Sequence, residues 1–331
     1  MLGIYIERSI NMTAAINNNR TKLWKRDVIR SVDFYNNWFL TFAPDAYRSA
    51  RNAAIDRVDA VLIQTKNFSK ITEATLKRNP EVLGVLRMAT APPIARERLV
   101  GLAGVSKNLV EKMEMGEIPK RMPPAILDAD LKKIISMIER LLDVDIFSWI
   151  KDNKTPSATI RRRAASIVAD RVCGAVADPI IRKEQEKRQL AAISAYLNNL
   201  GYKYINPKAV DDFRDIPAGH YSYHFNVSVS VGSNNSVNIP IDVVIMRQSA
   251  KRGDFPILIE CKSAGDFTNT NKRRKEEAVK ITQLKNTYGK QIEFMLFLCG
   301  YFDSGYLGYE AAEGIDWIWE HRISDFSKMG I

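Results

Sequence analysis

The chain contains few cysteines and no long apolar run. Its 331 residues include three cysteines, Cys173, Cys261 and Cys299, which lie far apart and mostly within apolar segments. They form neither a zinc-ligand spacing nor an even set for disulfide pairing, so we expect reduced, buried thiols. No uninterrupted apolar run reaches the length of about 18 residues that a membrane-spanning helix needs.

The N-terminus lacks the features of a secretory signal. The first residues, MLGIYIERSINMTAA, carry Glu7 and Arg8 early and have no long apolar core. We therefore expect a cytoplasmic protein. Hydrophobic residues make up 46% of the chain and charged residues 26%, which is typical of a soluble globular protein with one large or two ordinary domains.

Acidic residues are outnumbered by basic ones. The chain has 38 Asp and Glu residues against 49 Lys and Arg residues, a formal net charge of +11. A polyanion is therefore an expected partner, although charge alone does not separate nucleic acid from an anionic membrane surface.

The strongest local pattern lies around residue 251. Residues 238–264 read NIPIDVVIMRQSAKRGDFPILIECKSA, in which two apolar runs flank a polar segment that contains Gly253. This pattern predicts a β-hairpin with its turn near Lys251.

A hairpin that is symmetric about Lys251 sets Asp242 opposite Glu260. Side chains alternate along a strand, so Lys262 points to the same face as Glu260. Two adjacent carboxylates repel each other, and a Mg²⁺ ion, which prefers oxygen ligands, relieves that repulsion. The neighbouring ammonium then holds, or helps to deprotonate, a water molecule that attacks a phosphodiester.

The ordinary alternative is a surface ion pair between Glu260 and Lys262, with Asp242 unrelated to it. A D…ExK match alone is weak evidence. The apolar runs that these charges interrupt are typical of strands buried on both faces, and this context favours a functional cluster.

The arrangement is similar to the PD-(D/E)xK nuclease superfamily, with Asp242 as the first acid and Glu260-Cys261-Lys262 as the ExK motif. In the motif, proline directly precedes aspartate. Here one residue separates them, as Pro240-Ile241-Asp242. A more specific resemblance, to the XamI-type family of type II restriction endonucleases, rests on the blocks IECKSAGDFTNTNKRRKEEAVKITQLKNTYG and FLCGYFDSGYLGYEAAEGIDWIWEHRISDF in the C-terminal half.

This resemblance implies an α/β nuclease core, a mixed β-sheet flanked by helices as in restriction endonucleases. It implies a Mg²⁺-dependent type II enzyme that hydrolyses phosphodiesters in both strands of a short specific double-stranded DNA site and leaves 5′-phosphates. By resemblance, Asp242 and Glu260 bind the metal, the backbone carbonyl of Cys261 adds a ligand, and Lys262 orients the attacking water. Symmetric cutting implies a homodimer, with a cognate DNA methyltransferase as functional partner.

A helix is expected to begin at Asp178-Pro179 and to end before Gly201. In the nuclease superfamily a helix before the core sheet can lend a carboxylate to the metal, which makes Glu186 or Glu184 a candidate ligand. The alternative for either residue is pairing with neighbouring Lys and Arg side chains.

The N-terminal half is expected to be helical. Trp24, Val28, Val32 and Tyr35 recur at three- and four-residue steps until Pro44 interrupts them, and the pattern continues to about Met122. A further amphipathic helix is expected over 127–150, followed by a polar linker. We therefore divide the chain into an all-α domain, 1–155, and a nuclease domain, 156–331, whose α/β core spans 178–331.

Residues 95–119, ARERLVGLAGVSKNLVEKMEMGEIP, resemble the helix-turn-helix of phage-repressor-like DNA-binding domains. Ser106 is expected to cap the second helix, which leaves Lys107, Asn108 and Lys112 on its outer face, where such helices reach base edges. A helical hairpin that merely shares this packing is an equal alternative.

Polar and basic residues follow the ExK motif. Thr268, Asn269 and Asn271 are short donors and acceptors suited to phosphate or base edges, and Lys272, Arg273 and Arg274 add positive charge beside the candidate site. A helix is expected over 272–288, with Ala278, Val279, Ile281 and Leu284 facing inward.

Two other functions fit the same residues. A repair or recombination nuclease with the same core would recognise DNA shape more than sequence. A helix-turn-helix regulator would bind DNA with an inert D…ExK patch.

Overall fold

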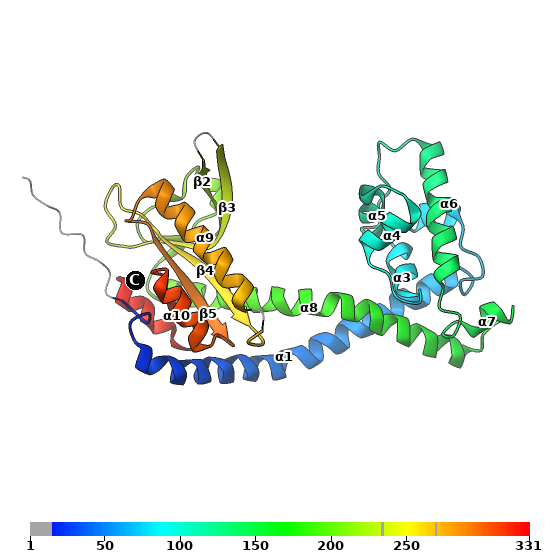
Figure 1. The fold of residues 1–331 in the computed structure, drawn as a ribbon, viewed down its shortest axis with the longest axis horizontal. Coiled ribbons are helices and arrows are strands. Elements are labelled where there is room, and N and C mark those ends of the chain that lie inside the picture. Colours follow the sequence, from blue (N-terminus) through cyan, green and yellow to red (C-terminus); the bar gives the residue numbers. More distant parts are fainter. Residues whose placement is uncertain (1–14, 233–234, 269) are drawn as a thin grey trace, which may run out of the picture. The chain divides into compact units, whose positions relative to one another are not determined.

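The computed structural model describes residues 15–232, 235–268 and 270–331 (Figure 1). The chain forms two compact units. The nuclease-like unit comprises the chain up to Thr41 together with Arg182–Ile331, and the helical unit comprises Phe42–Ile181. Both boundaries fall inside long helices, α1 (Thr21–Gln64) and α8 (Ala158–Asn199).

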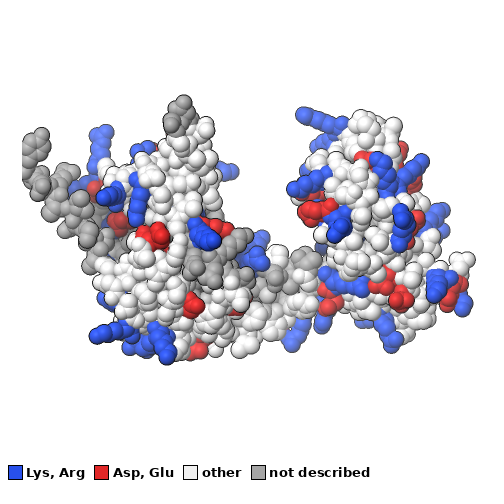
Figure 2. Space-filling model, in the orientation of Figure 1, with Lys and Arg blue, Asp and Glu red and all other residues white. Residues whose placement is uncertain are grey.

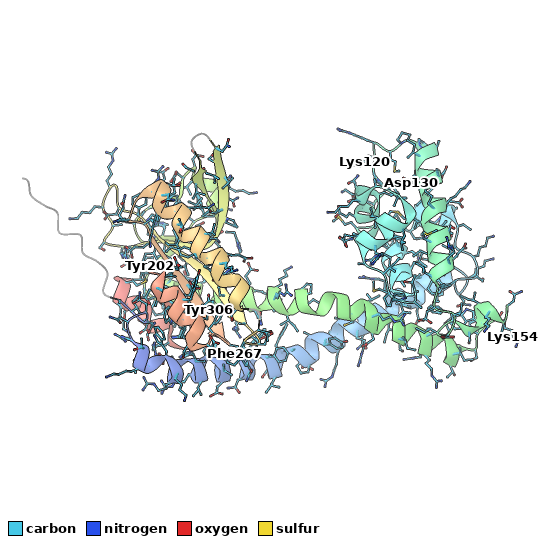
Figure 3. The ribbon with its side chains drawn as sticks, viewed as in Figure 1. Lys120, Asp130, Lys154, Tyr202, Phe267 and Tyr306 are labelled. Carbon is cyan, nitrogen blue, oxygen red and sulfur yellow. The ribbon has the colours of Figure 1, made fainter. Side chains whose placement is uncertain are left out.

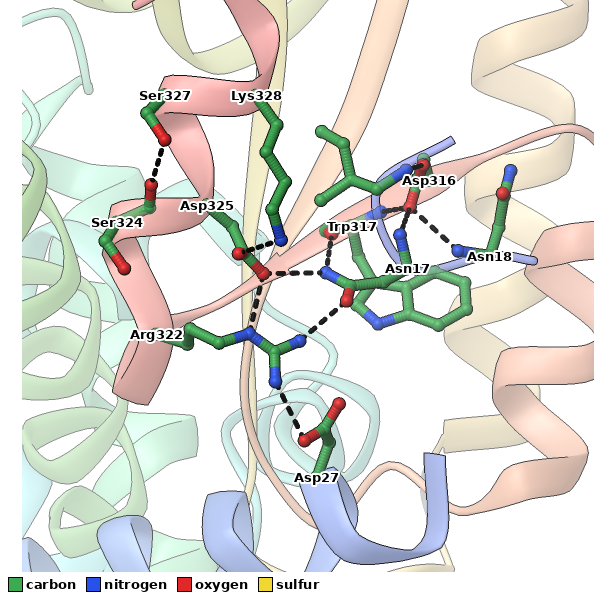
Figure 4. Close-up of polar contacts among 11 residues, drawn as sticks. Asn17, Asn18, Asp27, Asp316, Trp317, Arg322, Ser324, Asp325, Ser327 and Lys328 are labelled. Carbon is green, nitrogen blue, oxygen red and sulfur yellow. Dashed lines mark hydrogen bonds and ion pairs between the residues drawn. The ribbon is translucent and has the colours of Figure 1, made fainter. Parts of the chain in front are cut away.

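This division differs from the boundary expected between residues 155 and 156. The helical unit is internal, because the start of the chain packs with its end (Figure 4). Arg322 joins Asp27 at 2.8 Å and Asn17 at 2.6 Å, and the carboxylate of Asp316 accepts the backbone N–H of Asn17 at 3.0 Å. Trp24 contacts Trp317 with ring centroids 5.6 Å apart.

The two prolines expected at helix boundaries lie inside helices instead. Pro44 is within α1, and Pro179 is within α8, which therefore does not begin at Asp178. A proline removes one backbone hydrogen bond and bends a helix, but the bonds on either side can carry the helix through.

The regular elements of the helical unit are helices. Besides parts of α1 and α8, they are α2 (Glu73–Arg78), α3 (Val82–Met88), α4 (Arg96–Ala103), α5 (Lys107–Glu114), α6 (Pro124–Leu141) and α7 (Ser148–Lys151). Leu62, Leu86, Leu109 and Leu131 are fully buried in one core. The helix expected over 127–150 thus ends at Leu141 and is followed by the short α7.

The nuclease-like unit is built on a mixed sheet, as expected, with six strands in sequential order. Its strands are β1 (Lys203–Tyr204), β2 (His220–Val231), β3 (Asn235–Met246), β4 (Ile257–Ala264), β5 (Glu293–Gly300) and β6 (Asp316–Trp319). Strands β2, β3 and β4 are antiparallel, and β4, β5 and β6 are parallel. The connections of the parallel strands contain α9 (Thr270–Tyr288) and α10 (Ser304–Ala312), and 3₁₀ segments are η1 (Pro207–Ala209), η2 (Phe213–Asp215) and η3 (Glu320–Met329).

Helices cover both faces of this sheet. On one face, Ile281 and Leu284 of α9 pack in the same core as Leu258 of β4. On the other, Ile193 and Leu197 of α8 pack in a core with Ile259. In Figure 1, α9 lies along β4.

The three cysteines are free thiols, as the sequence predicts. Cys173 and Cys299 are buried and Cys261 is half-buried. Across the described residues, every helix is too short or too polar to cross a bilayer.

Candidate active site

The hairpin predicted around Lys251 is present, in the expected register. Val243 pairs with Ile259 and Ile245 with Ile257, and the next step of this register sets Asp242 opposite Glu260. The ladder ends there, so the strands begin to separate where the charged residues start.

Glu260 and Lys262 contact α9 through Lys280 and Glu277, and Asp242 bonds to the backbone of the residue between them. Asp242 Oδ2 accepts a hydrogen bond from the backbone N–H of Cys261 at 2.8 Å. Lys262 Nζ lies 3.0 Å from Glu260 Oε1. Because Leu258 packs toward α9 and side chains alternate, Glu260 and Lys262 point to the same side.

Helix α9 adds two residues that sequence reasoning missed. Lys280 Nζ lies 2.7 Å from Glu260 Oε2, and Glu277 Oε1 lies 3.5 Å from Lys262 Nζ. Glu277 also accepts a hydrogen bond from the hydroxyl of Tyr306 on α10 at 3.0 Å (Figure 3 labels Tyr306).

The signal for these two residues was present in the helical periodicity. Glu277 and Lys280 precede Ile281 and Leu284 by four residues each, so all four share the inward face of α9. Val279, expected on that face, is instead 56% exposed. Charged residues on the apolar face of α9 were thus the sequence signal for Glu277 and Lys280.

Burial and mutual repulsion shift the pKa values of the acids. Burial, and then the charge of Glu260, raises the pKa of Asp242 to about 6. Burial also raises the pKa of Glu277. Burial is the larger cause of both shifts, so a nearby cation would stabilise the charged form of each acid.

Lys262 is held in its charged form. Burial alone lowers the pKa of Lys262, but the carboxylates of Glu260 and Glu277 more than offset this effect and leave it above its ordinary value. An ammonium with a raised pKa donates hydrogen bonds to water and does not act as a base at neutral pH. Of the two roles considered for Lys262, orientation of water fits better than deprotonation.

The donor chemistry fits the magnesium ion that the sequence implies. Asp242 and Glu260 offer hard oxygen ligands. One of these oxygens already contacts a positive group, since Lys280 Nζ lies 2.7 Å from Glu260 Oε2. Lys280 Nζ also donates to the carbonyl oxygen of Pro240 at 2.9 Å.

The two carboxylates considered on the helix before the sheet have other partners in the structure. Glu184 pairs with Lys187 at 3.7 Å, and Glu186 lies 3.7 Å from His224. Among the described residues, no group of three His, Cys, Asp or Glu side chains is close enough to hold a metal. A metal bound here would therefore complete its shell with water or substrate oxygens.

The model of the XamI restriction endonuclease family matches residues 66–319 of this chain. The chain belongs to this family. It is 50% identical to the type II restriction enzyme SalI of Streptomyces albus G, over 95% of this chain and 99% of that enzyme. It is 26% identical to the type II restriction enzyme XamI of Xanthomonas campestris pv. amaranthicola, over 58% of this chain and 62% of that enzyme.

The predicted DNA-contacting loop of this XamI-family chain is only partly described. The backbone N–H and the hydroxyl of Thr268 both bond to Asp266, and α9 begins at Thr270, two residues earlier than expected. Asn269 lies outside the described residues, and so do the side chains of Asn271, Lys272, Arg273 and Arg274.

The helix pair predicted at 95–119 is present as α4 and α5. Gly104 takes the left-handed conformation, with φ 61°, and Ser106 caps α5 by accepting the N–H of Leu109 at 3.1 Å. On the outer face, Lys107 lies 3.6 Å from Glu111 and Lys112 lies 2.7 Å from Glu117.

These pairs mean that part of the positive charge on α5 is already neutralised. Asn108, between them in sequence, is exposed. On the face drawn in Figure 2, Lys and Arg side chains of the helical unit lie among Asp and Glu side chains. Contact of Lys107, Asn108 and Lys112 with DNA remains a prediction.

Strand β2 is irregular where it passes Asp242. Tyr223 pairs with Val243 and Phe225 with Ile241, while His224 between them has φ 52°. Tyr223 packs in the core on the α8 side, whereas Phe225 packs in the core on the α9 side. Alternate residues of β2 therefore point toward the α8 side before His224 and toward the α9 side after it. His224 lies directly across from Asp242.

Proposed function

We propose that this XamI-family protein is a type II restriction endonuclease that hydrolyses phosphodiesters in both strands of a short specific double-stranded DNA site. The observation that supports the proposal is the ion pair of Lys262 with Glu260, together with the bond of Asp242 to the backbone of Cys261 between them. The 50% identity with a type II restriction enzyme along nearly the whole chain supports it.

In this proposal Asp242 and Glu260 hold Mg²⁺, with the carbonyl of Cys261 as a further ligand. The bound ion supplies Lewis-acid polarisation of the scissile phosphate. The Lys262 ammonium, held between Glu260 and Glu277, donates hydrogen bonds to the attacking water and orients it. The water oxygen bonds to phosphorus and the bond to the 3′ oxygen breaks, which leaves a 5′-phosphate.

The loop after β4 and the start of α9 are proposed to bind the DNA. Thr268, Asn269 and Asn271 offer hydrogen bonds to phosphate or base edges, and Lys272, Arg273 and Arg274 offer positive charge. The net charge of +11 supports a polyanionic substrate. The α5 residues Lys107, Asn108 and Lys112 are proposed as a second contact.

The biological setting follows from this activity. A two-fold DNA site is matched by a homodimer, so we propose that two copies cut the two strands. A cytoplasmic location and a DNA methyltransferase that protects the host genome complete the proposal.

Replacement of the lysine at the site tests the function. Lys262→Ala is expected to abolish DNA cutting, because no ammonium orients the water, and to leave DNA retention in a gel shift intact. Lys290→Ala, at an exposed lysine after α9, is the control and is expected to cut normally. Cutting by a folded Lys262→Ala protein would contradict the proposed role.

A further inference from the structure

We infer that Lys280 is an internal counter-cation of Glu260, which a divalent metal ion must displace in order to bind. The inference rests on the proposed function, since it concerns the same site. It assigns a role to a residue outside the D…ExK motif.

Each oxygen of the Glu260 carboxylate contacts one ammonium group. Oε1 lies 3.0 Å from Lys262 Nζ, and Oε2 lies 2.7 Å from Lys280 Nζ. The Glu260 side chain is 11% exposed and that of Lys280 is 16% exposed, so water screens this pair poorly. The second oxygen is therefore not free for a metal while Lys280 stays in place.

The two lysines differ in what they would retain if a metal took Glu260. Lys262 also contacts Glu277, which Tyr306 holds from its other side. In the described part of the chain, Glu260 is the one carboxylate that pairs with Lys280, whose other contact is the neutral carbonyl of Pro240. Metal binding thus leaves Lys262 in a charged pair and deprives Lys280 of its own.

The position of Lys280 also explains how the site is held together without a metal. Its ammonium joins α9 to Pro240 of β3 and to Glu260 of β4. The charge of Lys280 opposes the rise in the pKa of Asp242 that burial, and then Glu260, causes. Its flexible four-carbon stem allows the ammonium to move away when a stronger cation enters.

Competition between Lys280 and the metal predicts the direction in which metal affinity changes when the lysine is replaced. A lysine that only stabilises the fold would, when removed, leave metal affinity unchanged or lower it, because the two carboxylates would be less well placed. A lysine that competes with the metal would, when removed, raise metal affinity. The two roles therefore give opposite results in one binding measurement.

The test is isothermal titration of the whole protein with Mg²⁺ at fixed pH and ionic strength, without DNA. Lys280→Met keeps the length of the side chain and removes its charge, and Lys290→Met is the matched control. We expect Lys280→Met to bind Mg²⁺ roughly 5- to 150-fold more tightly than the wild type, the usual range of coupling between two ligands. Lys290→Met is expected to bind like the wild type.

A second variant keeps the test valid if Lys280→Met does not fold. Lys280→Arg retains the charge and offers two parallel hydrogen bonds to Glu260, so it is expected to bind Mg²⁺ no more tightly than the wild type. Unchanged or weaker binding by folded Lys280→Met, or tighter binding by Lys280→Arg, would overturn the inference alone. Absence of Mg²⁺ binding and of DNA cutting in the wild type would instead overturn the proposed function.

Discussion

Each buried carboxylate near the site has different neighbours, and these neighbours determine its charge. Glu260 lies between two ammonium groups, while Glu277 shares Lys262 with it and receives the Tyr306 hydroxyl. Glu310 on α10 is fully buried, and burial followed by the charge of Glu277 raises its pKa to about 8. Glu310 is therefore neutral in the folded protein at neutral pH.

This neutral acid makes stability depend on pH. Between pH 5 and its folded pKa of about 8, Glu310 keeps its proton in the folded protein and has lost it in the unfolded chain. The free energy of unfolding is therefore highest at the low end of this range. It falls as pH rises, by at most about 1.4 kcal/mol per pH unit from Glu310. Glu310→Gln is expected to remove this fall, as measured by urea unfolding at pH 5, 6.5 and 8.

Glu313→Gln, at an exposed position of the same segment, is the control and is expected to follow the wild type. Parallel pH profiles for the wild type and Glu310→Gln would show that Glu310 is ionised in the folded state.

At the scale of elements, the sequence predicted the β3–β4 hairpin well. It did not predict the change of faces in the neighbouring strand β2. The register of β3 and β4 follows from local signals, two apolar runs and a turn that contains Gly253. The change of faces at His224 has no such signal. A left-handed backbone conformation is uncommon, and the residue type histidine does not predict it. The face that each residue of β2 takes beyond His224 was therefore not predictable.

The left-handed backbone at His224 predicts an unusual pattern of substitutions. His224→Val is expected to lower the free energy of unfolding by roughly 1–2 kcal/mol, because a side chain branched at Cβ clashes in this conformation. His224→Asn is expected to have little effect, since asparagine tolerates it. Chemical unfolding measures both.

Asn226→Val, at an exposed position of the same strand, is the matched control. It is expected to be neutral or slightly stabilising, because valine favours extended strands. Equal stability of His224→Val and Asn226→Val would contradict the backbone conformation described for β2.

At the scale of the whole molecule, the errors of prediction come from contacts distant in sequence. The backbone N–H of Ile16 bonds to Asp316 at 2.6 Å, 300 residues away, and such contacts move the start of the chain into the nuclease-like unit. Helical periodicity identified α1 but could not show what its first turns pack against. Periodicity likewise places Glu277 and Lys280 on the inward face of α9 but could not show that their partners lie on β4.

The elements that the sequence placed correctly are those with a local cause. Two apolar runs and a turn gave the β3–β4 hairpin, and the resemblance of residues 95–119 to a helix-turn-helix, with Ser106 as cap, gave the α4–α5 pair. The cluster of Asp242, Glu260 and Lys262 followed because all three belong to one hairpin. A third metal ligand from α8 is a prediction across elements, and in the structure Glu184 pairs with Lys187 and Glu186 lies near His224.

Digestion of a plasmid by the wild-type protein, with Mg²⁺ and with EDTA, followed by mapping of the fragment ends, tests the central claim most directly. The account predicts one reproducible set of discrete fragments with 5′-phosphate ends in Mg²⁺ and intact plasmid in EDTA. Nicks that follow DNA structure instead of sequence, or retention of DNA without any cleavage in Mg²⁺, would contradict it.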